Sequence, residues 1–345
     1  MKKFTKGCLI TALVLFIVGL IICGVGGLLG GFRELSEMDG IGSIPFRYYR
    51  NVESDWIGFY DEKELERLEN IEDIENMADW KSAELEGKKE QLALTADTLG
   101  SITIDLKECN LVIRESADEH VWISVDGSQH ETYYAIEDGK SGKSGLCIQN
   151  ETSHRRKYWK DNDMVCLWLP KDCVLEVCEV DMGAGYMTSS LFLKADQVNI
   201  TVGAGLLEAE GFEGDEITVL VGAGELLAGR VTAQRADFEV GAGHLCVDDL
   251  SISHEADLTV NMGVCEITGN ITGDLDLECD MGEAVLSLAG SQDDHSYEVD
   301  CGMGEVTIGS YSHSGLATER SWNTGKASEF DINCAMGNIT ITFDR

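Results

Sequence analysis

The chain has 345 residues, of which 62 are acidic and 26 are basic, and its formal net charge is −36. A field of this sign repels the phosphate backbone, which argues against DNA or RNA binding. The length allows one sizeable core with additional segments, and the 12 cysteines and 7 histidines follow no metal-ligand spacing.

The first predicted element is a membrane-spanning helix. Residues 8–32 carry no charge, and Lys2, Lys3 and Lys6 precede them. A helix of this length covers about 37 Å, more than the roughly 30 Å hydrocarbon core of a bilayer. The lysines predict a cytoplasmic N-terminus and an exported remainder. A cleaved signal peptide and a lipoprotein signal are the alternatives.

The segment 33–94 is predicted to be a juxtamembrane linker followed by an acidic helix. Residues 61–90 are rich in Glu and Lys and carry apolar residues at helical spacing. We expect this helix to act as a stalk or to cover the first coil of the domain that follows, because open strand edges invite aggregation. The predicted domains are therefore 1–32, 33–94 and 95–345.

From residue 178 onwards, one short pattern recurs about every twenty residues. Each copy contains a glycine and has apolar residues one, three and five positions before it, separated by mostly acidic or polar residues. Alternation at a period of two predicts a half-buried strand, and a regular series of such strands predicts a solenoid. The predicted corner glycines are Gly183, Gly203, Gly222, Gly241, Gly263, Gly282, Gly304 and Gly337.

Aligning the copies on these glycines predicts three inward-facing columns of apolar side chains, which a β-sandwich with chance glycines would not keep in register. Cys178, Cys279, Cys301 and Cys334 stand in these columns where other copies have Val or Ile, which predicts mostly reduced core residues. One disulfide between two of Cys279, Cys301 and Cys334 is the alternative. The predicted fold is all-β, a single-stranded parallel β-solenoid with an N-terminal transmembrane helix and a short helical stalk or cap. The column next to the glycine contains Met182, Val202, Val221, Val240, Met262, Met281, Met303 and Met336.

One candidate binding loop is the only basic island in the acidic exported region. It is interpreted either as a loop that balances nearby carboxylates or as a docking patch for an anionic polymer or partner. Its residues are Arg155, Arg156, Lys157, Tyr158 and Trp159.

A second candidate loop lengthens the spacing between Gly304 and Gly337. Residues 309–328 are rich in Ser, Gly and Thr and carry Tyr311 and Trp322. Insertions in solenoids emerge on one face, which is often the binding face, and aromatic side chains there can stack on sugars or peptides. A tolerated surface loop is the alternative.

The sequence contains none of the common catalytic motifs. There is no Gly-x-Ser-x-Gly elbow, no His-Glu-x-x-His and no phosphate-binding glycine loop. Acidic residues run along the strands without the focal pair that a glycosidase needs. His244 and Glu225 occupy equivalent positions on adjacent coils, which alone does not make a catalytic site. We therefore predict no enzymatic activity, no cofactor and no metal.

The anchor, the Ile102-x-Ile104-x-Leu106 opening, the 167–172 turn and the serial Val-x-Met/Val-Gly coils resemble the bacterial "putative adhesin" β-strand-repeat family. The likeness covers residues 95–345. It implies an exported parallel β-solenoid on a membrane anchor, often in Gram-positive bacteria, without catalytic residues. Some relatives are accessory proteins of cell-envelope stress operons.

The sequence thus predicts a single-pass membrane protein whose extracytoplasmic solenoid is a non-enzymatic binding or scaffold module of the cell surface. The alternative is an envelope-stress accessory protein that modulates a membrane signalling partner. Expected partners are the membrane, a cell-wall polymer, a surface ligand or an envelope protein. Self-association is expected through the anchor or through residues 338–343, the predicted open edge of the C-terminal coil.

Overall fold

The structure is a computed structural model, in which the chain separates into two compact units, Met1–Met77 and Ala78–Arg345. In the first unit, β1 (Arg47–Arg50) and β2 (Ile57–Tyr60) form an antiparallel pair. The residues that the structure describes are 47–50, 57–60, 85–126, 132–138, 142–150, 164–314 and 318–344.

The predicted membrane helix, residues 8–32, lies outside the described residues, as does most of the predicted acidic helix, residues 61–90. Among the residues that are described, no helix is long and apolar enough to cross a membrane.

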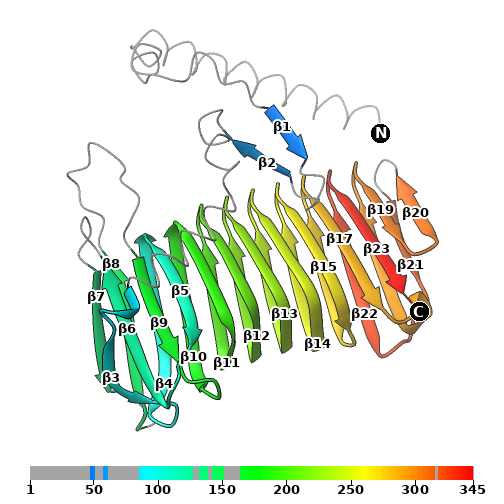
Figure 1. The fold of residues 1–345 in the computed structure, drawn as a ribbon. Coiled ribbons are helices and arrows are strands. Elements are labelled where there is room, and N and C mark those ends of the chain that lie inside the picture. The colour runs from blue at the N-terminus through cyan, green and yellow to red at the C-terminus, as the bar shows by residue number, and fades with distance from the viewer. Residues whose placement is uncertain are drawn as a thin grey trace. The chain divides into compact units, whose positions relative to one another are not determined.

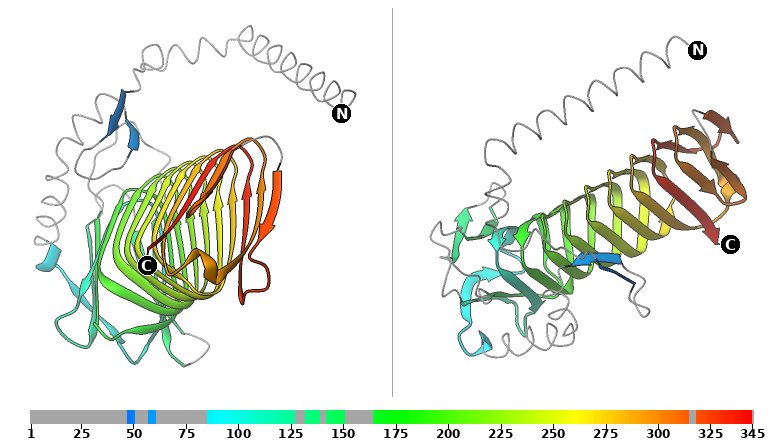
Figure 2. Two further views of the ribbon diagram at one scale, coloured as in Figure 1. Left: turned by 90° about the vertical axis from the view of Figure 1, so that its right-hand side faces the viewer. Right: turned by 90° about the horizontal axis from the view of Figure 1, so that it is seen from above.

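The second unit is a stack of parallel β-coils, each running from one glycine corner to the next (Figures 1 and 2). Neighbouring coils pair with an offset of 19 residues (Val198 with Ile217) or 20 residues (Ala236 with Ala256). This confirms the predicted all-β repeat. The central coils are the long strands β11 (Tyr186–Val202), β12 (Leu206–Val221), β13 (Glu225–Val240) and β14 (His244–Val260).

The core lies between the two halves of each coil. Before the corner, Val219, Phe238 and Leu258 stack on successive coils and are almost completely buried. The alternation changes phase in the middle of a coil, where Gly211 and Phe212 are buried in succession and the strand bends. Each apolar side chain thus contacts equivalent neighbours about 4.8 Å above and below, which explains why the columns stay in register.

The register of the later coils differs from the predicted one. Val240 pairs with Val260 and Val260 with Cys279, so Gly263 is equivalent to Gly243 and not to Gly241. A shift of two residues preserves the face of every strand position, so the other predicted columns remain buried. In the column next to the glycine, however, the four later residues are not buried. Met262, Met281, Met303 and Met336 are 60%, 54%, 63% and 51% exposed. The prediction that they face inward is wrong.

The predicted glycines occupy two different corner positions. A corner has three residues, as in Gly222-Ala223-Gly224, and a Cβ on the third residue would overlap the backbone of the preceding corner. In this way Gly243 lies against the carbonyl oxygen of Gly224, and Gly263 against that of Gly243. The predicted corner glycines up to Gly241 occupy the first corner position, and those from Gly263 onwards occupy the third. Only the third position carries glycine in every coil from Gly185 onwards.

The coils at the C-terminal end are not stacked in sequence order. Before the corner, β16 (Asp274–Cys279) pairs with β22 (Ser328–Cys334), and β22 pairs with β18 (His295–Cys301). The last coil is therefore inserted between two coils that precede it in the sequence.

The strands after the corner show the same insertion. β15 (Val264–Ile271) pairs with β17 (Glu283–Ala289), and β23 (Asn338–Asp344) lies between β17 and β19 (Glu305–Ile308). Because β23 is paired on both sides, the prediction that residues 338–343 form an open edge is wrong. The outermost coil is instead covered by the insertion, whose strands β20 (Tyr311–Ser314) and β21 (Thr318–Trp322) pair antiparallel with β19 and β18.

The N-terminal end is built in a related way. The first coil contains β4 (Leu99–Glu108) and β5 (Asn110–Glu115), which pair on one side with β10 (Val174–Ala184) and β11. On their other side lie β8 (Ser144–Asn150) and β9 (Met164–Leu169). Antiparallel strands again cover this end, namely β3 (Glu90–Thr95), β6 (His120–Asp126) and β7 (Thr132–Asp138).

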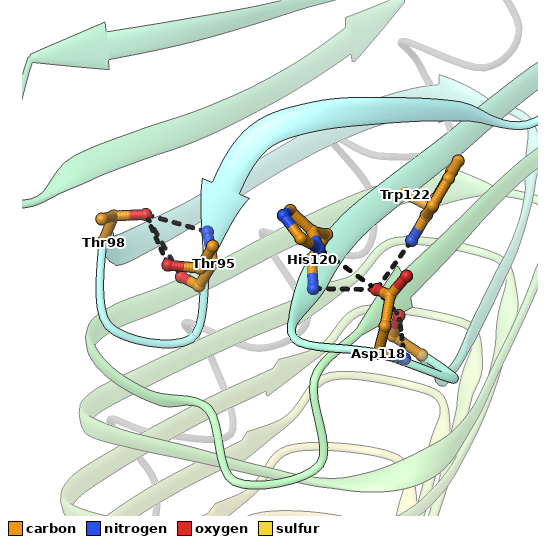
Figure 3. A network of polar contacts seen from close by, with 6 residues as sticks. Thr95, Thr98, Asp118, His120 and Trp122 are labelled. Atoms are coloured by element: carbon orange, nitrogen blue, oxygen red, sulfur yellow. Dashed lines mark hydrogen bonds and ion pairs between the residues drawn. The ribbon is translucent and has the colours of Figure 1, made fainter.

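A polar network holds the turn before β6 (Figure 3). One carboxylate oxygen of Asp118 accepts hydrogen bonds from the indole of Trp122 at 3.0 Å and from the backbone N–H of His120 at 2.9 Å. These bonds favour the charged form and lower the pKa of Asp118. The network has the geometry of a structural turn.

Candidate binding surfaces

The structure describes only one of the two predicted binding loops. The basic island, Arg155 to Trp159, lies outside the described residues. Tyr311 and Trp322 are brought together by the antiparallel strands of the C-terminal cap, with ring centroids 4.5 Å apart.

These two aromatic residues pack the cap onto the solenoid. Trp322 stacks on Tyr297 of the outermost coil with a centroid distance of 4.8 Å, and the hydroxyl of Tyr297 donates to the carbonyl of Gln292 in a short 3₁₀ turn (Gln292–Asp294). The guanidinium of Arg320 lies 5.6 Å from the ring of Tyr311. The contacts of Trp322 are those of a residue that closes the end of the rod.

A buried histidine lies in the same coil. The Nδ1 of His295 is 2.8 Å from the hydroxyl of Ser328, which itself donates to the carbonyl of Gly273, so the histidine Nδ1 carries the proton. The ring stacks on Phe330 at 4.1 Å. Burial lowers the pKa of His295. The neutral form of His295 therefore holds the inserted coil in place, through Ser328 and Phe330.

A column of carboxylates runs across successive coils on the outer face before the corner. Asp237 pairs with Asp257, Asp257 with Asp276, Asp276 with Asp331, and Asp331 with Glu298. We call these five residues the acidic ladder. The strands β16, β18 and β22 contain no lysine or arginine to offset them.

The charges of the acidic ladder act on one another. Partial burial and the neighbouring Glu255, Asp276 and Asp237 raise the pKa of Asp257. Partial burial, Asp276 and Asp300 likewise raise the pKa of Asp331. Carboxylates that resist ionisation in this way form a face on which a cation relieves repulsion.

His244 and Glu225 do form a pair. The Nδ1 of His244 lies 3.0 Å from Glu225, and its Nε2 lies 3.5 Å from Glu266 on the other side. Burial lowers the pKa of His244, but the hydrogen bond and the charges of the two glutamates outweigh this effect and raise the pKa. These contacts link three successive coils.

Apart from Cys109, the described cysteines are free, and most of them are buried. Burial raises the pKa of Cys178 and of Cys334 to about 12, so both are protonated at neutral pH. Because the thiolate is the reactive form, these side chains behave as small apolar core residues.

The corrected register places a column of methionines at the corner. Met262, Met281, Met336 and Met303 follow one another on neighbouring coils, in this spatial order, and line an open groove of about 720 Å³. The predicted register placed these methionines in the core, so the sequence did not predict this surface. The Gly-Ala-Gly triplets of the earlier coils, such as Gly203-Ala204-Gly205, are the sequence signal that reveals it, because only their second glycine recurs in all the later coils.

Comparisons with known proteins add the following findings. A family model described as Toastrack DUF4097 matches residues 99–342. No curated protein matches the chain.

Solved structures also resemble the chain. A "putative adhesin" from Parabacteroides distasonis is 13% identical over 73% of this chain and 95% of its own, with a TM-score of 0.40. A "putative cell adhesion protein" from Clostridium sporogenes is 11% identical over 74% and 99%, with a TM-score of 0.22. A "putative lipid binding protein" from P. distasonis is 11% identical over 74% and 96%, with a TM-score of 0.33.

Proposed function

Because the chain belongs to the Toastrack DUF4097 family, whose model matches residues 99–342, we propose that it is a non-enzymatic binding module that holds an extended ligand along its stacked coils. Membership also confirms the resemblance to an adhesin-like β-strand-repeat family. The observation that carries the proposal is the acidic ladder, a row of carboxylates on a rigid sheet.

The spacing of the ladder argues for an elongated cationic ligand. Adjacent rungs are about 4.8 Å apart. Two like charges at that distance repel by about 0.9 kcal/mol even in water, so the row is kept at a cost to the fold. A polymer or protein segment with repeated positive groups relieves this repulsion at several rungs at once, and the net charge of −36 attracts it from solution. Such groups occur on cell-wall polymers and on envelope proteins.

The proposed place of action is the outer side of the cell membrane, with residues 8–32 as an uncleaved anchor. Protease added to protoplasts is expected to degrade the chain beyond about residue 33, since the positive-inside rule exports that part. A solenoid that stays protected would contradict this topology.

The ladder is tested with the full chain in detergent, by measuring its binding to purified cell-wall polymer and to a lysine-rich peptide. The variant carries Asp257→Asn, Asp276→Asn and Asp331→Asn. We expect the affinity to fall about tenfold or more and its salt dependence to weaken. The variant is expected to be at least as stable as the parent because a repulsion has been removed.

The matched control carries Asp196→Asn, Glu210→Gln and Asp215→Asn, which change the net charge equally on other exposed positions. It is expected to bind as the parent does. Equal losses in both variants would show that bulk charge is responsible, and unchanged binding in the ladder variant would refute the proposal.

The alternative role, modulation of a membrane signalling partner in an envelope-stress system, rests on the anchor and on the juxtamembrane segment. Stress signalling that survives loss of the ladder but not replacement of residues 1–46 by an unrelated anchor would favour it.

A further inference from the structure

The corner of the solenoid changes its chemistry halfway along the stack. Ala223 and Ala242 occupy the corner tip in two central coils, and Met262, Met281, Met336 and Met303 occupy the equivalent position in the next four. The backbone is the same in both halves. The N–H of Ala242 donates to the preceding corner at 2.7 Å, and those of Met262 and Met281 do so at 2.7 and 2.8 Å. Alanine therefore satisfies the fold, and the corner does not require methionine.

The methionine side chains also gain little from packing, since each remains more than half exposed. They line the open groove together with the third-position glycines, such as Gly282 and Gly337. Because these glycines have no side chains, they leave the groove beside the methionines open.

We propose that this methionine column binds a soft monovalent metal ion, Cu(I) or Ag(I), through thioether sulfurs from adjacent coils. Thioethers favour soft ions over Mg²⁺ or Ca²⁺, which take oxygen ligands. A metal–sulfur bond is about 2.3 Å long, so two sulfurs on one ion lie up to about 4.6 Å apart. Neighbouring coils are about 4.8 Å apart, and three rotatable bonds let each methionine make up the difference.

The charge around the groove favours a cation over a lipid or a neutral partner. Glu283 and Glu305 line the groove beside the methionines, and Asp280 directly precedes Met281. Among the residues described, no group of three or more His, Cys, Asp and Glu side chains is arranged to hold a metal. The thioethers are therefore the ligands, and the carboxylates supply the attracting field.

The nearby thiols lie on the other side of the corner backbone. Cys279, Cys334 and Cys301 are buried directly inside, and a Cβ on Gly337 would come within 2.5 Å of the Cys279 sulfur. They do not reach the groove in the folded protein, but thiols bind the same ions, so any measurement must control for them.

The test titrates the full chain in detergent after accessible thiols have been blocked with N-ethylmaleimide. Ag(I) is added in chloride-free buffer and followed by calorimetry, and Cu(I) is presented by competition with bicinchoninate. The variant Met281→Leu/Met336→Leu keeps the size and apolarity of the groove and removes its two central sulfurs. We expect its affinity for both ions to fall about tenfold or more with an unchanged unfolding midpoint. An unchanged affinity, or no binding by the parent chain, would overturn the proposal.

Two further measurements separate metal binding from other roles. Bound Ag(I) is expected to protect Met281 and Met336 from peroxide, as followed by mass spectrometry of methionine sulfoxide, and equal oxidation with and without Ag(I) would overturn the proposal. Adding Ala223→Met and Ala242→Met to the leucine variant is expected to restore binding, because it places three thioethers on adjacent corners up to Met262. Failure to restore it, with the fold intact, would likewise overturn the proposal.

Discussion

The central coils and the two ends of the solenoid are built from the same strands by different rules. From β11 to β14, each coil pairs with its neighbours in the sequence, and the short repeat alone specifies the stacking. At each end, one coil is placed out of sequence order and covered by antiparallel strands. The difference shows that a local pattern suffices to continue a solenoid, while its termination depends on contacts between distant segments.

The largest expected effect concerns the central coils. Val240→Asp places a carboxylate among the apolar columns of β12 and β14, where no cation can pair with it. We expect a loss of about 3–5 kcal/mol in the free energy of unfolding, measured by urea denaturation. Glu239→Lys, one residue away on the exposed face, is expected to change stability by about 0.5 kcal/mol or less. Equal effects would contradict the assignment of faces.

A smaller effect is expected at the corner. Gly243→Ala brings a methyl group against the carbonyl oxygen of Gly224, so the stacked corners must separate slightly. We expect a cost of about 1–3 kcal/mol in thermal or urea unfolding, as for other overpacked sites. The exposed neighbour Ala242 serves as the control, and Ala242→Ser should be nearly neutral. A harmless Gly243→Ala would mean that the corners are not in backbone contact.

A substitution at an end of the solenoid is expected to destabilise only that end, whereas a substitution in the central coils destabilises the whole stack. Trp322→Ala removes the ring that stacks on Tyr297 and is expected to lower the local opening free energy of β18 and β21 by about 1–2 kcal/mol. Amide hydrogen exchange should show faster exchange in these strands and unchanged protection in β12 and β13. Uniformly faster exchange along the whole stack would show that the ends and the centre unfold as one unit.

The smallest expected effects are opposite pH dependences of two histidines. Burial lowers the pKa of His295 in the C-terminal cap, so its contribution to stability falls as the pH drops below about 6.5, the value in the unfolded chain. The pKa of His244 in the centre is raised, so its contribution is complete below about 6.5 and is lost as the pH rises through the folded-state value.

Urea unfolding of the parent, His295→Asn and His244→Gln between pH 5 and pH 8 checks these signs. The free energy of unfolding of His295→Asn should fall less than that of the parent as the pH is lowered. His244→Gln should be less stable than the parent mainly at the acidic end of the range. The same slope in all three proteins would contradict both assignments.

Sequence reasoning identified the repeat because Ile200, Val219 and Phe238 follow a period that only stacked strands satisfy. It misplaced the later methionines because a shift of two residues leaves every strand position on the same face, and only Met262 and its equivalents reveal the error. The coil order at the C-terminal end could not be predicted from the sequence, because β18 and β22 present equivalent apolar faces to β16. The acidic and methionine columns depend on that register and order, so neither could be aligned before the structure was known.

The inserted coil also has a consequence for how the chain reaches its final arrangement. A chain that emerges N-terminus first exposes β18 before β22, and β18 can pair with β16 in a register that sets Leu277 beside Val299 and Cys279 beside Cys301. This pairing satisfies the same apolar pattern as the native one, so we expect it to form a competing intermediate that must dissociate before β22 can enter. We therefore expect the C-terminal end to be the slow step of assembly, and an oxidant present while the chain folds is expected to trap the intermediate by joining two thiols that β22 keeps apart in the finished stack.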